Sequence, residues 1–501
     1  MRLSQLIADV GGSLPPGTPD PEIRAVTADS REAGDGALFV CVAGGSRDGH
    51  DFAAQAAAKG AAAILVEREV DAPGALVIRV ASTRAALARC AAALQGHPEE
   101  KLSLVGITGT NGKTTVSWLF RSIAVAAGSS CGVIGTTGAF AGAKELPTTH
   151  TTPDSVSLSK LLGTMVAEGC DSAVLEVSSH ALEQGRVEGL RFAAAAFTNL
   201  TRDHLDYHGS MEAYFEAKAR LFSDHLRDGG AAVINADDAW GRQLAESVDP
   251  TTLLRFSIDD SACEIFARNV EFSDAGIRAD VATPAGGFAL RSPLVGAHNL
   301  QNLLCATGLA LACGHGLEAI AKGLFGAHGA PGRLERVDGE GFSAFVDYAH
   351  TDDALARVCA ALRQAGKGRL LVVFGCGGDR DKGKRPLMGE VAARAADLAI
   401  VTSDNPRSER PEEIIAGILP GLERAGSRRL SHEEARAGAL GFAVEPDRRS
   451  AIELAVACAR PGDFVLVAGK GHETYQLVGD QRLHFDDREE LRRALGSRMD
   501  R

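Results

Sequence analysis

Seven residues, Gly-Thr-Asn-Gly-Lys-Thr-Thr at positions 109–115, restrict the possible folds of this chain more than any other feature. They follow an apolar run at residues 102–108 and precede a helical pattern that begins at Lys113. A buried strand, a glycine-rich turn and a helix in this order direct backbone N–H groups and the positive end of a helix toward one anion. Lys113 would then bridge the β- and γ-phosphates of a nucleotide, and the Thr114 hydroxyl would bind Mg²⁺. The pattern predicts a phosphate-binding loop in an α/β domain.

This loop departs from the strict Walker pattern, which has a glycine six residues before the lysine. Ile107 stands at that position. The alternative interpretation is a glycine- and threonine-rich connection that binds no ligand. The strand before the turn, the helix after it and the Gly-Lys-Thr core favour phosphate binding.

The 501 residues suit about three domains. Residues 1–98 predict a small α/β domain, which ends at a polar, proline-containing break. Residues 99–332 contain apolar runs spaced by helical patterns, which predict a parallel sheet covered on both faces, followed by short strands at 263–296. Residues 333–501 restart the alternation and predict a second doubly wound, Rossmann-like unit. The expected strands are residues 37–42, 61–66, 75–80, 102–108, 172–177, 192–198, 230–235, 342–346, 369–374, 398–401 and 463–467.

Composition excludes several functional classes. A formal net charge of −12 argues against nucleic-acid binding and against an anionic membrane surface. Ten cysteines stand singly, without metal-ligand spacing, as in reduced cytoplasmic proteins. The N-terminus resembles a short amphipathic helix, not a signal peptide, and no apolar run approaches the length of a membrane span. We expect a cytoplasmic monomer that does not insert into membranes.

Three further residues are candidates near the phosphate loop. Glu176 ends the apolar run at 172–177, where ligands gather in open α/β sheets, although such a glutamate is more often a surface or capping residue. His204 lies in the histidine-rich run 198–209 and is a second candidate, with an ordinary loop histidine as the alternative. Lys218 falls on the apolar stripe of the helix expected at 211–222. It must snorkel, pair or lose its charge, and the pattern alone favours snorkelling. A neutral buried amine is also able to take up CO₂ and become a carbamate.

The segment Ser-Asp-Asn-Pro-Arg at 403–407 follows another expected strand. Asn-Pro stiffens the turn between an anion and a cation. Arg407 offers a planar fork for a carboxylate, and Asp404 accepts from an ammonium group. The segment suits a zwitterionic amino-acid end, with a solvated turn as the alternative.

Taken together, these motifs resemble the Mur ligase family, which adds amino acids to the UDP-linked peptidoglycan precursor, and the resemblance extends over nearly the whole chain. Its markers are residues 109–115, 176–180 and 198–209, Lys218, Asn299 with Asn302, Arg333 and residues 347–350. The resemblance implies three domains, at residues 1–98 for the UDP substrate, 99–332 for ATP and 333–501 for the amino acid. Two positions depart from the family pattern: Asp352 replaces a usual proline, and His150 stands where asparagine can occur.

The resemblance also implies a set of site residues. Those implied for ATP are Gly109, Thr110, Asn111, Gly112, Lys113, Thr114, Thr115, Asn299, Arg333, Asp347 and His350. Catalytic roles are implied for Lys113, Glu176, His204 and Lys218, with two Mg²⁺ held by Thr114, Glu176, His204 and carbamylated Lys218. The UDP-linked substrate would meet Ser30, Gly45, Ser46, Arg47, Thr151, Thr152, Ser178, Gln184 and Arg186. Diaminopimelate would meet Arg380, Asp404, Asn405, Pro406, Arg407, Gly469 and Glu473.

The implied activity is ATP-dependent addition of meso-diaminopimelate to UDP-N-acetylmuramoyl-L-alanyl-D-glutamate through an acyl phosphate. This reaction belongs to peptidoglycan precursor synthesis and hence to cell-wall formation, cell shape and cell division. Closure of the third domain is expected to exclude water. Four alternatives compete. A lysine-adding ligase lacks the equivalent of Arg407, and folylpolyglutamate synthase lacks an N-terminal domain of this kind. A P-loop switch or motor requires the strict Walker loop, and a non-catalytic nucleotide-binding module has no need for Glu176, His204 and Lys218 together.

Overall fold

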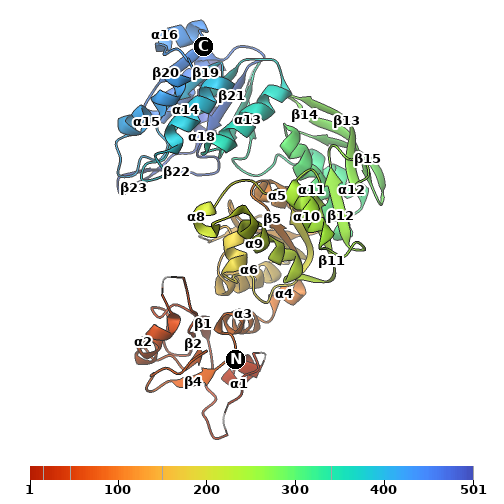
Figure 1. The fold of residues 1–501 in the computed structure, drawn as a ribbon, viewed down its shortest axis with the longest axis vertical. Coiled ribbons are helices and arrows are strands. Elements are labelled where there is room, and N and C mark those ends of the chain that lie inside the picture. Colours follow the sequence, from red (N-terminus) through yellow and green to blue (C-terminus); the bar gives the residue numbers. More distant parts are fainter. Residues whose placement is uncertain (9, 15, 46, 149, 340, 500–501) are drawn as a thin grey trace. The chain divides into compact units, whose positions relative to one another are not determined.

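The computed structural model describes residues 1–8, 10–14, 16–45, 47–148, 150–339 and 341–499. The chain divides into two compact units, and Figure 1 labels many of its helices and strands. The first contains Met1–Phe266, Ala282–Gly286 and Leu303–Gly323, and the second contains Ala267–Val281, Gly287–Asn302 and Leu324–Arg501. Within the described residues, no helix is both long and apolar enough to span a lipid bilayer.

The first unit begins with a four-stranded parallel sheet in the order β1-β2-β3-β4. Alternate residues of β2 enter two different hydrophobic clusters: Leu38 and Val40 pack with α1 and α3, and Phe39 packs with α2. Both faces of this sheet are therefore covered. The elements are α1 (Leu3–Ala8), β1 (Ala25–Thr27), β2 (Ala37–Val40), η1 (Gly49–Phe52), α2 (Ala53–Ala58), β3 (Ala63–Val66), β4 (Leu76–Arg79) and α3 (Thr83–Leu94).

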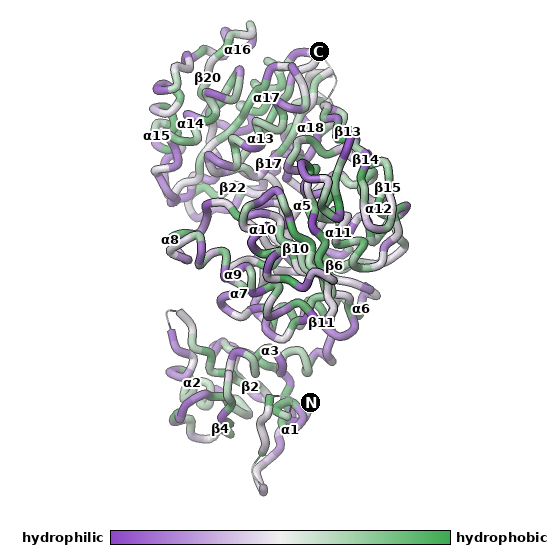
Figure 2. The backbone as a smooth tube through the Cα atoms, turned by 45° about the vertical axis from the view of Figure 1, so that its right-hand side comes forward, coloured by the Kyte–Doolittle hydropathy of each residue, from purple (hydrophilic) through white to green (hydrophobic). Residues whose placement is uncertain are grey.

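A larger sheet follows, in the order β12-β11-β10-β5-β9-β6-β7-β8. Strand β5 lies at its centre, between β10 and β9, and pairs in parallel with both. Figure 2 shows hydrophobic segments around β10 and hydrophilic segments at α8. The strands are β5 (Ser103–Thr108), β6 (Cys131–Gly135), β7 (Gly138–Ala141), β8 (Lys144–Leu146), β9 (Ser172–Glu176), β10 (Phe192–Phe197), β11 (Leu226–Asn235) and β12 (Leu253–Ser257).

The next helices and strands follow the expected alternation, and short strands appear in the segment predicted to contain them. The helices are α4 (Pro98–Lys101), α5 (Lys113–Ala126), α6 (Ser155–Ala167), α7 (Ser179–Glu183), α8 (Leu205–His208), α9 (Met211–Ser223), α10 (Ala239–Glu246), α11 (Ala297–Ala312) and α12 (Leu317–Gly326). The short strands are β13 (Ile265–Ser273), β14 (Gly276–Thr283) and β15 (Gly286–Ser292).

The second unit contains a six-stranded sheet in the order β16-β17-β21-β18-β19-β20, with only β16 antiparallel to its neighbour. Alternate residues of β18 enter two hydrophobic clusters, so helices cover both faces. The strands are β16 (Glu335–Asp338), β17 (Ser343–Asp347), β18 (Leu370–Phe374), β19 (Leu398–Val401), β20 (Gly441–Val444), β21 (Phe464–Ala468), β22 (Tyr475–Val478) and β23 (Gln481–His484). The helices are α13 (Asp352–Ala365), α14 (Lys384–Ala395), α15 (Pro411–Arg424), α16 (His432–Ala437), α17 (Arg448–Cys458) and α18 (Asp487–Met499).

The predicted α/β class is confirmed. Two local features differ from the prediction. The break at residues 96–100 contains the short helix α4, with Pro98 at a first-turn position where its missing N–H costs nothing. The central sheet also continues into an antiparallel edge, in which β7 and β8 are joined by a two-residue turn. Gly142 takes the first turn position with φ of 57°, which favours glycine there.

Candidate active site

The loop between β5 and α5 has the geometry of an anion-binding turn. Gly109 and Gly112 adopt φ angles of 143° and 88°, in the region that favours glycine. A Cβ atom at Gly109 would lie 1.9 Å from the Thr198 hydroxyl oxygen, so no larger side chain fits. The Lys113 ammonium donates to the carbonyls of Gly109 and Thr110 at 2.8 and 2.9 Å. Strand, glycine-rich turn and helix therefore follow one another as the sequence predicted.

Glu176, the last residue of β9, faces this loop. Its carboxylate accepts from the Thr114 hydroxyl at 2.9 Å, from the Thr136 backbone N–H at 2.9 Å and from the Thr136 hydroxyl at 3.0 Å. Glu176 is buried, and a Cβ atom at Gly135 would lie 2.1 Å from its Oε1 atom. Hydroxyl and carboxylate oxygens are the ligands that Mg²⁺ prefers, so this donor set fits that ion. Thr136 was not predicted; the Gly-Thr-Thr turn after the apolar run at 131–134 was its signal.

Lys218 lies on α9 and is 1% exposed, so the snorkelling favoured by the sequence pattern is wrong. Its ammonium donates to the Gly109 carbonyl at 2.9 Å and lies 4.5 Å from the centre of the Tyr214 ring. The lysine remains inside because the phosphate loop offers it a carbonyl acceptor. Burial, together with the Lys113 charge, holds the pKa of Lys218 well below its usual range. A lowered pKa raises the share of the neutral, nucleophilic form of the amine.

A group of aromatic and histidine rings lies beside the same loop. His204 begins α8 with φ of 52°, and its ring centre is 4.9 Å from that of His180. The Nε2 atom of His208 lies 2.9 Å from the Ser179 hydroxyl, and its Nδ1 atom lies 3.3 Å from the Glu183 carboxylate. Burial lowers the pKa of His180 and of His208. Neutral imidazoles are the form that ligates metal ions.

Two of the residues predicted for the nucleotide substrate line one cavity of about 800 Å³ in the first unit. These are Ser30, whose hydroxyl donates to Gln55 at 3.0 Å, and Arg47. The cavity is also lined by Asp29, Arg31, Asp154, Ser157 and Lys160, which the sequence did not single out. Gly45 is exposed and does not belong to the described lining, and Ser46 lies outside the described residues.

The other five predicted substrate residues form one hydrogen-bonded network. The Thr152 hydroxyl donates to the Glu176 carbonyl at 2.8 Å and accepts from the Ser178 N–H at 3.1 Å. Arg186 donates to the Thr152 carbonyl at 2.8 Å and to Gln184 Oε1 at 2.7 Å. Thr151 and Thr136 place their hydroxyl oxygens 3.2 Å apart. The network therefore connects this group of residues directly to Glu176.

Arg84 of α3 is a neighbour of this network that the sequence did not predict. Its guanidinium donates to the carbonyls of Gln184 and, at 2.9 Å, of Ala43. A Cβ atom at Gly185 would lie 2.5 Å from Arg84 Cδ, so glycine gives the arginine its space.

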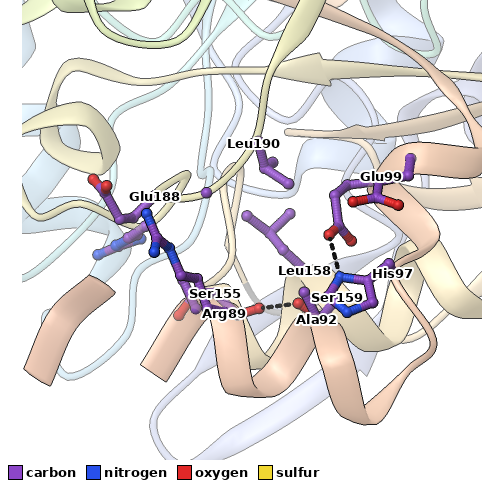
Figure 3. A pocket seen from close by; sticks show the side chains of 13 residues that line it. Arg89, Ala92, His97, Glu99, Ser155, Leu158, Ser159, Glu188 and Leu190 are labelled. Atoms are coloured by element: carbon purple, nitrogen blue, oxygen red, sulfur yellow. Dashed lines mark hydrogen bonds and ion pairs between the residues drawn. The ribbon is translucent and has the colours of Figure 1, made fainter. Parts of the chain in front are cut away.

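A cavity of about 240 Å³ lies between α3, α4, α6 and residues 186–190 (Figure 3). Leu158 and Leu190 lie in the middle of this view, with His97 beside Glu99 at one side. His97 Nδ1 is 3.1 Å from Glu99 Oε1, and with Glu100 these form the one group of three potential metal ligands found in the described part of the chain. Among the described lining residues, Arg186 is the one that the sequence predicted.

The second unit holds a cavity of about 500 Å³ at the carboxyl ends of β18, β19 and β21. It brings together six of the seven residues predicted for the amino acid, together with His350. These residues are Arg380, Asp404, Asn405, Arg407, Gly469 and Glu473. Pro406 is not in the described lining, and its carbonyl instead packs against Gly378, where a Cβ atom would lie 1.9 Å from it.

The charged groups of this cavity are held by specific contacts. Arg407 adopts φ of 52°, its N–H donates to the Leu477 carbonyl at 3.0 Å and its Nη1 donates to the Gly378 carbonyl at 2.7 Å. The Asn405 amide donates to Glu473 Oε2 at 2.8 Å. The cavity therefore presents guanidinium groups and carboxylates together, as the recognition of a zwitterion requires.

The remaining predicted ATP residues also belong to the second unit. Asp347 is buried and accepts from the N–H groups of Leu334 and Ala349, each at 2.7 Å, and burial raises its pKa. Asn299 is buried and donates to the Val295 carbonyl at 2.9 Å. The Arg333 guanidinium lies 4.8 Å from the centre of the Tyr348 ring, and burial lowers the pKa of His350.

Of the two departures from the family pattern, His150 is exposed. Asp352 is the first residue of α13, directly after the N-cap Thr351, whose hydroxyl accepts from the Ala354 N–H. A carboxylate in the first turn interacts favourably with the helix dipole, so Asp352 suits the position that proline occupies elsewhere.

Three family models match the chain. The model described as "Mur ligase family, catalytic domain" matches residues 22–95, "Mur ligase middle domain" matches residues 107–310 and "Mur ligase, glutamate ligase domain" matches residues 332–471.

Curated relatives match over almost the full length. The UDP-N-acetylmuramoyl-L-alanyl-D-glutamate–2,6-diaminopimelate ligase of Geobacter metallireducens is 46% identical over 505 residues, which cover 99% of this chain and 98% of the relative. The ligase of the same name from Gloeobacter violaceus is also 46% identical and covers 100% of this chain and 99% of its own.

Solved structures agree with this likeness. A structure of a UDP-N-acetylmuramoyl-L-alanyl-D-glutamate–2,6-diaminopimelate ligase superposes with a TM-score of 0.72 at 34% identity and covers 100% of both chains. Folylpolyglutamate synthase from Mycobacterium tuberculosis gives a TM-score of 0.60 at 19% identity and covers 78% of this chain and 92% of its own, which shows a shared fold alone.

Proposed function

The chain belongs to the Mur ligase family, and from this membership we infer that it joins 2,6-diaminopimelate to UDP-N-acetylmuramoyl-L-alanyl-D-glutamate with consumption of ATP. The reaction forms an amide bond in the synthesis of the peptidoglycan precursor. The cavity that gathers Asp404, Asn405 and Arg407 is the single observation that carries the amino-acid assignment. The substrate isomer in this proposal is meso-diaminopimelate.

The proposed division of labour follows three domains. Residues 1–98 bind the UDP-linked substrate, residues 99–332 bind ATP and residues 333–501 bind the amino acid. The separate sheets β1–β4 and β16–β21 support this division, as do the three ranges matched by the family models.

ATP binds at the loop of residues 109–115 in this proposal. Backbone N–H groups of the loop and the Lys113 ammonium receive the phosphates, and Thr114 and Glu176 hold Mg²⁺. The buried contact between Thr114 and Glu176 at 2.9 Å supports this pairing. Asn299, Arg333, Asp347 and His350 are proposed as further ATP contacts from their motif positions in the family.

His204 and Lys218 serve a second Mg²⁺, with Lys218 as its carbamate. The burial and the lowered pKa of Lys218 support carbamate formation, because CO₂ reacts with the unprotonated form of the amine. Carbamylation also turns a cation into an anion, and an oxygen anion suits Mg²⁺. When bound, the two ions neutralise charge on the phosphoryl and acyl oxygens.

The reaction proceeds in two steps. The side-chain carboxylate of D-glutamate attacks the γ-phosphorus of ATP, so a carboxylate oxygen–phosphorus bond forms as ADP leaves. The amine of diaminopimelate then attacks the acyl carbon, and inorganic phosphate leaves the tetrahedral intermediate. Lys113 and the loop N–H groups stabilise the negative charge on the phosphoryl oxygens. No covalent enzyme intermediate is needed.

The distal end of diaminopimelate carries an ammonium and a carboxylate. Arg407 receives the carboxylate through its planar fork, while Asp404 and Glu473 receive the ammonium. Arg380, Asn405, Pro406 and Gly469 complete the pocket. Lysine has no distal carboxylate and leaves Arg407 without a partner, which disfavours lysine as the substrate.

Two groups of residues receive the UDP-linked substrate. Ser30, Gly45, Ser46 and Arg47 meet the uridine diphosphate, and the cavity lined by Ser30 and Arg47 supports this assignment. The muramoyl-dipeptide meets the residues of the network that includes Glu176. These residues are Thr151, Thr152, Ser178, Gln184 and Arg186.

The proposal places the protein in the cytoplasm as a monomer, where the substrates of this step are small and soluble. Its product would contribute to cell-wall growth and thereby to cell shape and division.

Phosphate release from ATP with UDP-N-acetylmuramoyl-L-alanyl-D-glutamate tests the proposal. Release should require diaminopimelate and should remain near background with lysine or without an amino acid. Arg407→Ala removes the guanidinium proposed to receive the distal carboxylate. Arg410→Ala serves as its control, because Arg410 is a nearby surface arginine with a 75% exposed side chain. Equal release with lysine and diaminopimelate would overturn the amino-acid assignment.

A further inference from the structure

Lys470 follows β21 and is 0% exposed, yet it carries an ionisable amine into the second unit. It stands between Gly469 and Gly471, whose φ angles of 123° and 55° turn the chain sharply on either side. Lys470 does not belong to the described lining of the 500 Å³ cavity and lies behind its wall. It therefore has no direct route to a ligand in that cavity.

The Lys470 ammonium contacts three residues that do line the cavity. Its Nζ donates to Asn405 Oδ1 at 3.1 Å and to Glu473 Oε2 at 3.4 Å, and it lies 3.8 Å from Asp404 Oδ1. Asp404 Oδ1 is buried and accepts no hydrogen bond in the described structure. The Lys470 ammonium, 3.8 Å away, forms an ion pair with it. One cation thus serves two carboxylates and one amide.

The contact with Asn405 also sets the direction of the amide. Its Oδ1 accepts from Lys470 and from the Leu477 N–H at 3.0 Å, which leaves the NH₂ group to donate to Glu473. Reversing the amide would place its NH₂ group against two donors. Lys470 and the Leu477 N–H therefore together determine that the NH₂ end of the Asn405 amide meets Glu473.

The charge balance depends on the same nitrogen. Burial lowers the pKa of Lys470. The Asp404, Glu473 and Asp487 carboxylates oppose that lowering, and the Arg448 guanidinium adds to it. Without the ammonium, two carboxylates would remain close together at a partly desolvated wall, and such pairs take up a proton. A protonated carboxyl is a poor partner for a substrate ammonium.

We propose that Lys470 is a positioning residue for amino-acid selection, which keeps Asp404, Asn405 and Glu473 in the geometry that receives the distal ammonium of the amino acid. This inference rests on the proposed function of the cavity. Lys470 acts through its neighbours and does not touch the substrate.

Lys470→Met tests the proposal, because methionine has a similar length without charge. The KM for diaminopimelate should rise about tenfold. In the pH profile of kcat/KM for diaminopimelate, the acid limb should move upward by about one pH unit, which corresponds to a tenfold change in proton binding. The KM for ATP should change less than about twofold, since the contacts described for Lys470 are with the amino-acid-pocket residues Asp404, Asn405 and Glu473. Lys470→Arg should retain the wild-type position of the acid limb.

Arg369→Met is the matched control. Arg369 also pairs with a buried carboxylate of this unit, Asp463 at 2.6 Å, but it lies at the opposite end of the sheet, before β18. A general loss of stability should affect both variants alike, whereas the shift of the acid limb should occur only in Lys470→Met. A parallel rise of both KM values, or an unmoved limb, would overturn the proposal.

If Lys470→Met does not fold, wild type and Lys470→Arg still decide the question. Lys470→Arg keeps a positive charge at this position, so its acid limb for diaminopimelate should coincide with that of wild type, and a limb displaced upward would contradict the inference. Failure of the proposed function has a different signature, because wild type would then release no phosphate in response to diaminopimelate. The same pH profile is in that case measured with whichever amino acid supports release.

Discussion

Arg448→Met probes the ion pair that holds the amino-acid pocket together. Arg448 and Asp487 are both fully buried and make two hydrogen bonds of 2.6 and 2.7 Å. The same guanidinium donates to the carbonyls of Ser403 at 3.2 Å and Ala468 at 3.0 Å. These carbonyls directly precede Asp404 and Gly469 of the pocket. The substitution should therefore destabilise the second unit and disturb both pocket loops.

The expected loss follows from the burial of the pair. Removing one partner of a buried ion pair costs about 3–5 kcal/mol, because the other charge remains without compensation. The carbonyls of Ser403 and Ala468 also lose a donor, at a cost of about 1 kcal/mol each. We therefore expect a loss of stability in the upper part of that range. About 1.4 kcal/mol corresponds to a tenfold change in an equilibrium constant. Hydrogen exchange that requires opening of the second unit should accelerate by about a thousandfold.

Hydrogen–deuterium exchange with peptide resolution is the assay, read at β19 and β21. Both tryptophans, Trp118 and Trp240, lie in the first unit, so their fluorescence reports whether that unit remains folded. Arg449→Met is the matched control, because Arg449 pairs with Glu490 at 2.8 Å but is half exposed. An exposed pair contributes about 0–1 kcal/mol, so this variant should exchange almost as wild type.

The double variant Arg448→Met/Asp487→Leu separates lost pairing from lost packing. It removes both charges, so it should recover much of the stability that the single variant loses. An acceleration below about tenfold in Arg448→Met would refute the reasoning, because about 1.4 kcal/mol lies well below the cost of breaking a buried pair.

Three further outcomes are expected. Lys218→Ala should nearly abolish phosphate release, and short carboxylates should restore part of it; full activity would exclude the carbamate. Arg407→Ala should lower kcat/KM for diaminopimelate by about 10- to 100-fold, the equivalent of a charged hydrogen bond, while the KM for ATP stays constant. Unchanged diaminopimelate kinetics would mean that the pocket is misassigned. Burial lowers the pKa of His298 from 6.5 to about 4, so the unfolded chain binds a proton that the folded chain does not. Stability should be complete above pH 6.5 and fall as the pH drops toward 4, as urea denaturation can measure; an identical slope in His298→Gln would contradict this.

Local features of the sequence were enough to predict many of the strands and the strand–turn–helix of the phosphate loop. The strand Leu398–Val401 was predicted with the bounds observed, because apolar patterns and capping residues act within a few positions. Ser82, for example, caps α3 by accepting from the Ala85 N–H. The left-handed glycines of the phosphate loop also carry a local signal.

Tertiary structure alone decided which distant side chains meet. Thr136 reaches Glu176 across 40 positions because β6 and β9 are neighbours in the sheet, and strand order cannot be read from periodicity. Lys218 reaches the Gly109 carbonyl across 109 positions, which turned an expected surface lysine into a buried amine. Lys470 follows the same rule, since its partners Asp404 and Asn405 come from a different strand end. Backbone preferences are local and therefore legible in the sequence, whereas burial and charge compensation depend on neighbours that only folding brings together.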